Sequence, residues 1–370
     1  MGVLRLLLAF CVVISHSQPI FGYLGMGGGN AVPAFFIISG FYMHLVLATK
    51  YQGTKNVWLF YSNRFLRLFP SYWVVLLIVV GISMLPSFSN PFVDRVQYLC
   101  QNAVGRATDG NAASIAAAIP NLLMVGSDIV RLFAIDLPAN TLSILSQDGK
   151  ITDTFRDLSD YLILPPIWSV GVELVFYALA PLAVLLRTRF LVGLFIGFIL
   201  VQFGIAYNVD MAWRHLPSAY NISYFILGML SFRFSGQVER LPSWAIKALA
   251  CMPFVICLVP FDFILEGISK LLLWVVWLLY SSALPALFTL TRKWAWDRRA
   301  GDFSYPIYLC HWLFAWPAAA GWGNFGAPIA FIFSFVLAWV IVRLVDDPIE
   351  TFRQERVGQV RVKFLAVPAV

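Results

Sequence analysis

The sequence predicts an all-α fold, a polytopic membrane helical bundle with about ten transmembrane helices. Two observations support this fold class. Of the 370 residues, 60% are hydrophobic and only 12% are charged, which leaves too little polar surface to cover a soluble globule. The apolar residues also recur along the whole chain in runs of about 20, the length of helix that crosses a bilayer. We therefore expect a single membrane domain, not a soluble domain with one anchor.

The apolar runs define the expected spans. The first is predicted to be retained, not cleaved as a signal peptide, because its charged region is the single Arg5, no small-residue cleavage site follows, and His16 interrupts the apolar core. The runs lie at residues 4–24, 31–49, 69–87, 166–186, 190–208, 218–234, 244–262, 268–290, 303–322 and 326–345.

The distribution of Lys and Arg orients the bundle. These residues accumulate in every second connection, which by the positive-inside rule is cytoplasmic. The short connections on the other side hold only Arg214 and Lys270. Both termini are therefore expected in the cytoplasm, and orientation explains the net charge of +7 without a nucleic-acid partner.

The expected organisation is a membrane domain over residues 1–350 and a cytoplasmic tail over residues 351–370. One outer stretch, residues 88–165, is much longer than the other connections and contains more Asp than Lys and Arg together. Its apolar patch AIPNLLMVGSDIVRLFAI indicates a re-entrant or interfacial helix. The alternative is that this stretch holds two further spans.

Arg5 and His16 occupy the first apolar run. Ionisable residues inside spans are costly and usually face a partner or a polar cavity. On an α-helix the eleven-residue separation brings both side chains to one face, about 16 Å apart along the axis. With Arg5 at the inner edge, His16 lies just beyond mid-depth. It is a candidate site residue, or else a neutral histidine that bonds a neighbouring helix.

Glu173 and His311 are also ionisable residues inside expected spans. Glu173 lies roughly 10 Å below the outer surface, at a depth close to that of His16. A carboxylate there would fix the tautomer of the imidazole and stabilise its charged form. The alternative is a structural hydrogen bond or ion pair. His311 lies slightly lower and is equally compatible with a site residue and a satisfied core histidine.

Arg64 and Arg67 stand one helical turn apart where the third span opens at the cytoplasmic edge. Two guanidinium groups at this spacing can bind one phosphate-bearing ligand with fork geometry. The alternative is that both simply follow the positive-inside bias.

No pattern in the sequence indicates a metal site. The five cysteines show neither metal-ligand nor redox spacing, so small buried side chains are the simpler interpretation. The sequence also contains no phosphate-binding P-loop and no dinucleotide fingerprint.

Five motifs give the chain a resemblance to a known family. They are LRLLLAFCVVISH, with ten residues between its arginine and its histidine, VPAFFIISGFYM, NRFLRLFPSYW, WSVGVELVFYALAP and FSYPIYLCHW. In this order they resemble the acyltransferase 3 family of integral membrane acyltransferases, over the chain to about residue 350. Three positions depart from the family pattern. Gly2 and Val3 replace its frequent Asp-Gly, and Asn63 replaces the basic residue that often precedes R-x-x-R.

The resemblance implies an enzyme that moves an acyl group, usually acetyl, from cytoplasmic acetyl-CoA to a hydroxyl of a glycan or glycolipid. The acceptor would be handled at the outer face of a bacterial-type cytoplasmic membrane. The family's functional residues carry over as follows: catalysis to His16 and Glu173, donor binding to Arg5, Arg64 and Arg67, and a possible site residue at His311. In this scheme His16 is the general base or a transient acyl carrier, and Glu173 orients it.

A second class of function remains open at this point. In a proton-coupled transporter or glycan flippase, His16, Glu173 and His311 would form a proton relay. Transporters often show internal repeats and paired interrupted spans, and neither is evident in this sequence. The acyltransferase is therefore the preferred prediction.

Overall fold

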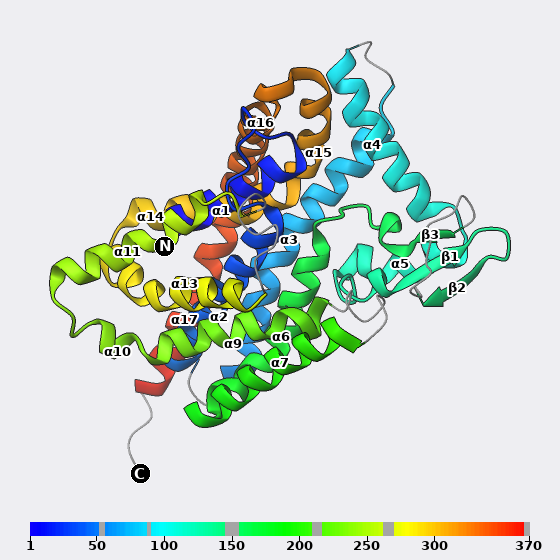
Figure 1. Cartoon of the computed structure of the whole chain (residues 1–370). Helices are drawn as coiled ribbons and strands as arrows, with labels where there is room; N and C mark the ends of the chain where they lie inside the picture. The colour runs from blue at the N-terminus through cyan, green and yellow to red at the C-terminus, as the bar shows by residue number, and fades with distance from the viewer. Residues whose placement is uncertain (52–55, 87–89, 145–154, 209–216, 262–269, 366–370) are drawn as a thin grey trace.

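The computed structural model describes residues 1–51, 56–86, 90–144, 155–208, 217–261 and 270–365. Most of this chain is helical, as the sequence predicts, and the helices gather into one bundle (Figure 1). Each expected span overlaps one helix. These helices are α1 (Gly2–His16), α2 (Gly28–Thr49), α3 (Val57–Ser83), α6 (Ile167–Leu185), α7 (Thr188–Asn208), α9 (Pro217–Arg233), α11 (Ser243–Leu258), α13 (Lys270–Thr291), α15 (Ser304–Trp322) and α16 (Gly326–Ile341).

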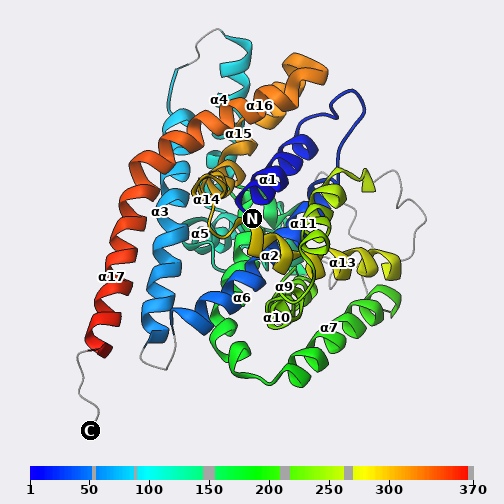
Figure 2. The same cartoon turned by 90° about the vertical axis from the view of Figure 1, so that its left-hand side faces the viewer.

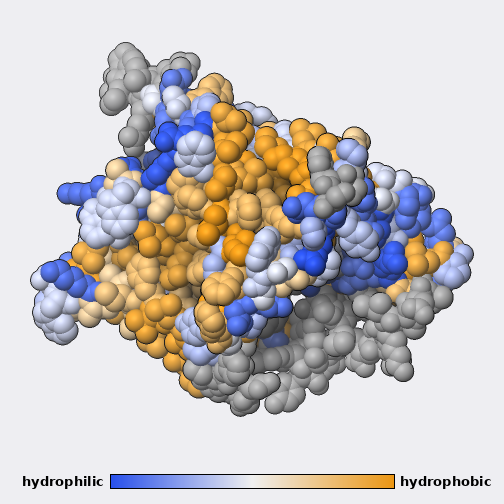
Figure 3. Space-filling view, turned by 90° about the horizontal axis from the view of Figure 1, so that it is seen from above, coloured by the Kyte–Doolittle hydropathy of each residue, from blue (hydrophilic) through white to orange (hydrophobic). Residues whose placement is uncertain are grey.

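By length and hydropathy, five segments of the described chain can each cross a membrane. They are α2, α3, α6, the Leu272–Thr291 part of α13, and the continuous stretch Ala295–Gly358 that includes α15 and α16. The outer surface agrees with a lipid environment, because apolar side chains such as Ile332, Val336 and Trp339 on α16 are exposed. Figure 3 shows a broad hydrophobic area bordered by hydrophilic residues. The chain is an integral membrane protein, and the number of ten crossings stays a prediction.

Two helix boundaries differ from the predicted spans. α1 ends at His16, not at residue 24, because the chain then enters a loop in which three glycines adopt positive φ. α3 begins at Val57, well before residue 69. Arg64 and Arg67 therefore lie within α3 and not at its opening, since the helix continues through the mixed polar and apolar residues that precede them.

The centre of the bundle is the contact between α2 and α9, whose backbones touch. A Cβ atom on Gly40 would lie 2.0 Å from the carbonyl oxygen of Phe225, and one on Gly228 would lie 1.9 Å from that of Ile37. Small residues allow membrane helices to approach this closely. Next to this contact, the ring of Phe225 stacks on that of Phe176 at 4.1 Å, which adds α6 to the same core.

The described part of the stretch predicted to lie on the outer side, residues 90–144 and 155–165, folds beside the bundle as helices and a small sheet (Figure 1). Its elements are α4 (Pro91–Thr108), α5 (Ala112–Leu123), η2 (Val130–Leu132), β1 (Phe133–Asp136), β2 (Thr141–Ile144), β3 (Phe155–Asp157) and η3 (Leu158–Tyr161). The three strands form an antiparallel sheet in the order β2-β1-β3. The all-α prediction therefore needs correction for this sheet, whose strands of three or four residues are too short to give a visible alternation.

The apolar patch at residues 118–135 does not form one helix. α5 ends at Leu123 because Met124 takes a left-handed conformation with φ of 57°, and the patch finishes in β1. With twelve residues, α5 is shorter than the roughly 20 that cross a bilayer. The alternative of two further spans thus finds no support in the described part of this stretch.

The end of the last span continues into another helix. α16 passes through the π-helix η5 (Val342–Asp346) into α17 (Asp347–Leu365), which runs beside α3 (Figure 2). Arg356 joins these helices by donating to Asn63 and Ser62 at 3.1 and 2.8 Å. Residues expected as a tail therefore form part of a packed helix. Three short helices complete the described part of the fold: α10 (Ser235–Val238), α14 (Ala295–Asp302) and η4 (Gly323–Phe325).

Candidate active site

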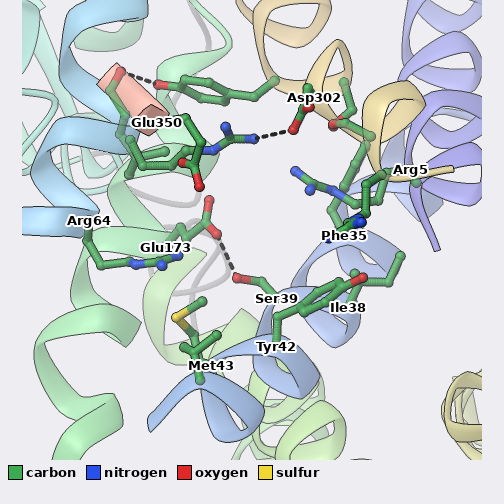
Figure 4. A pocket seen from close by; sticks show the side chains of 18 of the residues that line it. Arg5, Phe35, Ile38, Ser39, Tyr42, Met43, Arg64, Glu173, Asp302 and Glu350 are labelled. Carbon is green, nitrogen blue, oxygen red and sulfur yellow. Dashed lines mark hydrogen bonds and ion pairs between the residues drawn. The ribbon is translucent and has the colours of Figure 1, made fainter. Parts of the chain in front are cut away.

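A cavity of about 620 Å³ lies among α1, α2, α3, α6, α14, α15 and α17. Its wall carries seven basic and four acidic side chains, so its charge is positive. The basic residues are Arg5, Lys50, Arg64, Arg67, Arg298, Arg299 and Arg353, and the acidic residues are Glu173, Asp297, Asp302 and Glu350. Figure 4 shows Arg5, Arg64, Glu173 and Ser39 directed toward the same space. Four residues predicted from sequence, Arg5, Arg64, Arg67 and Glu173, therefore meet in one place.

The position of Arg5 is set by how α1 begins. The backbone N–H groups of Gly2 and Val3 donate to the carboxylate of Asp297 on α14, at 2.9 and 3.0 Å. Gly2 has no side chain to obstruct this contact, since a Cβ there would lie 1.5 Å from a carbonyl oxygen of α14. Arg5 then faces the cavity one turn later. Among the described residues, none accepts a hydrogen bond from its guanidinium or forms an ion pair with it.

Arg64 and Arg67 project from consecutive turns of α3. Arg67 lies 3.8 Å from a carboxylate oxygen of Asp302. Arg64 has no acidic partner among the described residues, and its guanidinium instead lies over the rings of Phe60 and Tyr177, with centroids at 5.7 and 5.9 Å. The two cations predicted to bind a phosphate-bearing ligand are thus both on the wall, and one of them is not neutralised.

Glu173 faces the cavity and is held by two hydroxyl groups. The hydroxyl of Ser39 on α2 donates to it at 2.6 Å, and that of Tyr177, one turn further along α6, also donates to it. The contact expected between Glu173 and His16 is not formed, since no hydrogen bond or ion pair joins them within the described chain. The two residues point to different neighbours.

His16 lies at the exposed end of α1, outside the residues that line the cavity. Its Nδ1 is 3.0 Å from the carbonyl oxygen of Val12. A proton on Nδ1 satisfies that contact and leaves Nε2 with a free lone pair, so a main-chain carbonyl takes the orienting role expected of Glu173. The start of α2 lies alongside, because Gly28 donates its N–H to the hydroxyl of Ser15 and a Cβ on Gly28 would lie 3.8 Å from the His16 ring.

His311 packs against His16 from α15. Their ring centroids are 5.0 Å apart, and His311 has no exposed surface. Its Nδ1 contacts the carbonyl oxygen of Tyr308 at 2.6 Å, whereas its Nε2 is buried without a hydrogen-bond partner in the described structure. Tyr308 itself lines the cavity, and its hydroxyl bonds Ser169 at 2.6 Å. Tyr308 therefore connects the histidine pair to the cavity wall.

Several residues of the site were not predicted from the sequence. Tyr177 was detectable, since its spacing of four from Glu173 places both on one helix face. Ser39 on α2, Asp302 on α14, and Glu350 and Arg353 on α17 reach the cavity only through tertiary packing. No group of His, Cys, Asp or Glu in the described residues has the arrangement of a metal site.

The chain is similar to one family of known proteins over most of its length. A family model described as an acyltransferase domain matches residues 1–343. The match includes all six of the residues predicted for the site and ends in η5, before α17 begins. No curated protein and no solved structure matches the chain.

Proposed function

The chain belongs to the acyltransferase 3 family, and on this premise we propose that it transfers acetyl from cytoplasmic acetyl-CoA to a hydroxyl of a cell-surface or exported glycan. That it is a membrane acyltransferase follows from the family and from its long apolar helices. The donor, the acceptor class and the location in a bacterial-type cytoplasmic membrane are the proposal.

The observation that carries the proposal is that Arg5 and Arg64 present their guanidinium groups on one cavity wall and that neither forms an ion pair with a described residue. Buried cations without acidic partners are costly, and an anionic ligand offsets that cost. The phosphates of acetyl-CoA are suitable anions, because the planar guanidinium fork matches their oxygen atoms. In this reading Arg5, Arg64 and Arg67 hold the donor at the cytoplasmic mouth.

The transfer itself is assigned to His16. Arg5 and His16 share one face of α1, about 16 Å apart, so the thioester arm would run along α1 past Tyr308 toward the histidine pair. Nε2 of His16 accepts the proton of the acceptor hydroxyl. At the same time the hydroxyl oxygen attacks the carbonyl carbon of the thioester. The carbon–sulfur bond then breaks, and the CoA thiolate takes up that proton. Transient acetylation of His16 is the second form of the same proposal.

Glu173 contacts Ser39 and Tyr177 in the site, and not His16 as expected. Its carboxylate fixes the hydroxyls of Ser39 and Tyr177 on the cavity wall. We assign it to positioning these groups beside the donor, while Val12 orients His16.

A transporter or flippase is less well supported. Its proton relay would join Glu173 to the histidines, and no direct hydrogen bond links Glu173 to His16 or His311 among the described residues. The family match also favours acyl transfer.

Proteoliposomes that contain the full chain test the proposal with acetyl-CoA labelled in the acetyl group. We expect release of free CoA and labelled glycan when cell-surface polysaccharide is supplied. Glycan movement without consumption of the thioester would reverse the assignment to acyl transfer. Mass spectrometry of surface polysaccharides from cells with and without the protein then identifies the acceptor.

A further inference from the structure

Arg353 lies in α17, beyond the end of the family match, yet it lines the same cavity as Arg64 and Arg67. Its side chain is almost fully enclosed, since the residue is only 8% exposed. A cation at such a position needs either a compensating acid or an anionic ligand.

The protein satisfies only part of this guanidinium. One terminal nitrogen donates to Glu350, three residues earlier on the same helix. The Nε atom is buried and has no hydrogen-bond partner among the described residues. The described protein therefore leaves part of the donor capacity of this guanidinium unused at the cavity wall, and an anion with two oxygen atoms, such as a phosphate, is a matching acceptor.

Arg353 also belongs to a cluster of like charges. It lies within electrostatic range of both Arg64 and Arg67, and each interaction is repulsive. Three guanidinium groups from two helices thus border one space with Glu350 as an acid beside them. An anion bound among them would attract each of the three guanidinium groups and so offset the repulsion of Arg353 by Arg64 and Arg67.

A purely structural role explains Arg353 poorly. The docking of α17 on α3 is provided by Arg356, which bonds Ser62 and Asn63. The pair of Glu350 with Arg353 lies within one helix, so it does not hold α17 to another part of the protein.

We propose that Arg353 is a donor-binding residue, whose guanidinium joins those of Arg64 and Arg67 in holding the phosphate groups of acetyl-CoA. α17 is then a wall of the donor site and not a tail. The inference rests on the proposed function, because it takes the donor to be a CoA thioester.

The test compares two donors with the same acetyl thioester, namely acetyl-CoA and S-acetylpantetheine, which has no phosphate. Arg353→Gln should raise the KM for acetyl-CoA about tenfold, the effect of one charge-assisted hydrogen bond. The KM for S-acetylpantetheine should stay unchanged. Arg353→Lys keeps the charge without the fork, so its KM for acetyl-CoA should fall between those of the other two proteins.

Two further variants separate binding from packing. Glu350→Gln removes the competing carboxylate and should lower the KM for acetyl-CoA, which tests the idea even if Arg353→Gln does not fold. Arg343→Gln removes an exposed arginine of η5 that lies 3.9 Å from Asp347 and outside the cavity wall. Arg343→Gln is the matched control and should leave the KM for both donors unchanged.

An unchanged KM for acetyl-CoA in Arg353→Gln overturns the inference, and so does an equal rise for both donors, which would indicate a structural role. The proposed function is tested by a separate measurement, the consumption of acetyl-CoA by the wild-type protein. If that fails, direct binding of adenosine 3′,5′-bisphosphate still decides the inference. Weaker binding by Arg353→Gln than by the wild type supports the inference. Equal binding by the two proteins overturns it, and so does a wild-type protein that does not bind the bisphosphate.

Discussion

The imidazole rings of His16 and His311 meet edge to face, with centroids 5.0 Å apart. This contact joins the end of α1 to α15 and sets an exposed ring against one with no exposed surface. Both rings direct Nδ1 to a main-chain carbonyl of their own helix, so the two Nε2 atoms are the nitrogens left for chemistry. A base whose tautomer is fixed by the backbone is ready to accept a proton.

His16→Ala should lower kcat by at least about 100-fold, the range for loss of a general base. The protein should still insert and fold, because the ring is exposed and its loss leaves no buried cavity. The measurement is CoA thiol release by purified protein whose elution profile matches the wild type. Ser17→Ala, at the end of the same helix, is the control and should remain active. Full activity in His16→Ala would refute the catalytic role.

Arg64→Ala should raise the KM for acetyl-CoA about tenfold with little change in kcat. Arg64 forms no ion pair with a described acid, so its full charge is available to bind the donor. Arg67→Ala should raise the KM less, since Asp302 already neutralises part of the positive charge of Arg67. Steady-state kinetics of the single and double variants measure both effects.

The control for these variants is Arg292→Ala, which removes an exposed arginine paired with Glu239 at 3.6 Å, away from the cavity. It should leave the KM unchanged. Unaltered donor affinity in the double variant of Arg64 and Arg67 would return both residues to a role in membrane orientation alone.

The helices were largely predictable because a bilayer imposes a simple rule, namely about 20 apolar residues for each crossing. Helix ends were less so. The start of α3 at Val57 lies in a mixed sequence whose helicity depends on packing against α17. The same applies to α17, whose charged residues suggest a solvated tail until Asn63 and Ser62 are seen to accept bonds from Arg356.

The sequence indicated which residues gather at the cavity better than it indicated their contacts, although His16 lies outside the cavity wall. The motifs indicated Arg5, Arg64, Arg67 and Glu173, and these four residues line one cavity. Depth along the helices suggested that Glu173 would bond His16, but depth does not fix the direction in which a side chain points. Glu173 turns to Ser39 and Tyr177 instead. That direction depends on how α1, α2 and α6 pack, and a single sequence does not encode it in local spacing.

Gly40→Ala should strongly destabilise the bundle. The added Cβ would lie 2.0 Å from the carbonyl oxygen of Phe225, so α2 and α9 would have to separate. Overpacking of this kind costs about 1–3 kcal/mol or more. Thermal unfolding in detergent measures the change.

Gly193→Ala is the matched control for Gly40→Ala. Gly193 lies inside α7, and a Cβ there would meet no atom within 4 Å. Alanine favours the helix over glycine by about 1 kcal/mol, so this variant should unfold at the wild-type temperature or above it. Equal behaviour of the two variants would contradict the close backbone contact.

Asp128 should make stability depend on pH. The residue is 1% exposed, and neither carboxylate oxygen has a hydrogen-bond partner among the described residues. Burial raises the pKa of this carboxyl above its ordinary value of about 4. Since the folded state holds the proton more tightly than the unfolded state, the neutral acid favours folding below the unfolded pKa. This contribution is lost as the pH rises through the folded pKa.

Asp128→Asn should remove this loss, because the amide stays neutral at every pH. The drop in unfolding temperature as the pH rises above about 4, the ordinary pKa of an Asp carboxyl, should therefore be smaller in this variant than in the wild type. Asp109→Asn, at an exposed position, should keep the wild-type pH dependence. If Asp128→Asn and the wild type lose stability in parallel, the buried carboxyl is not the group that titrates, and an acid elsewhere must account for the drop.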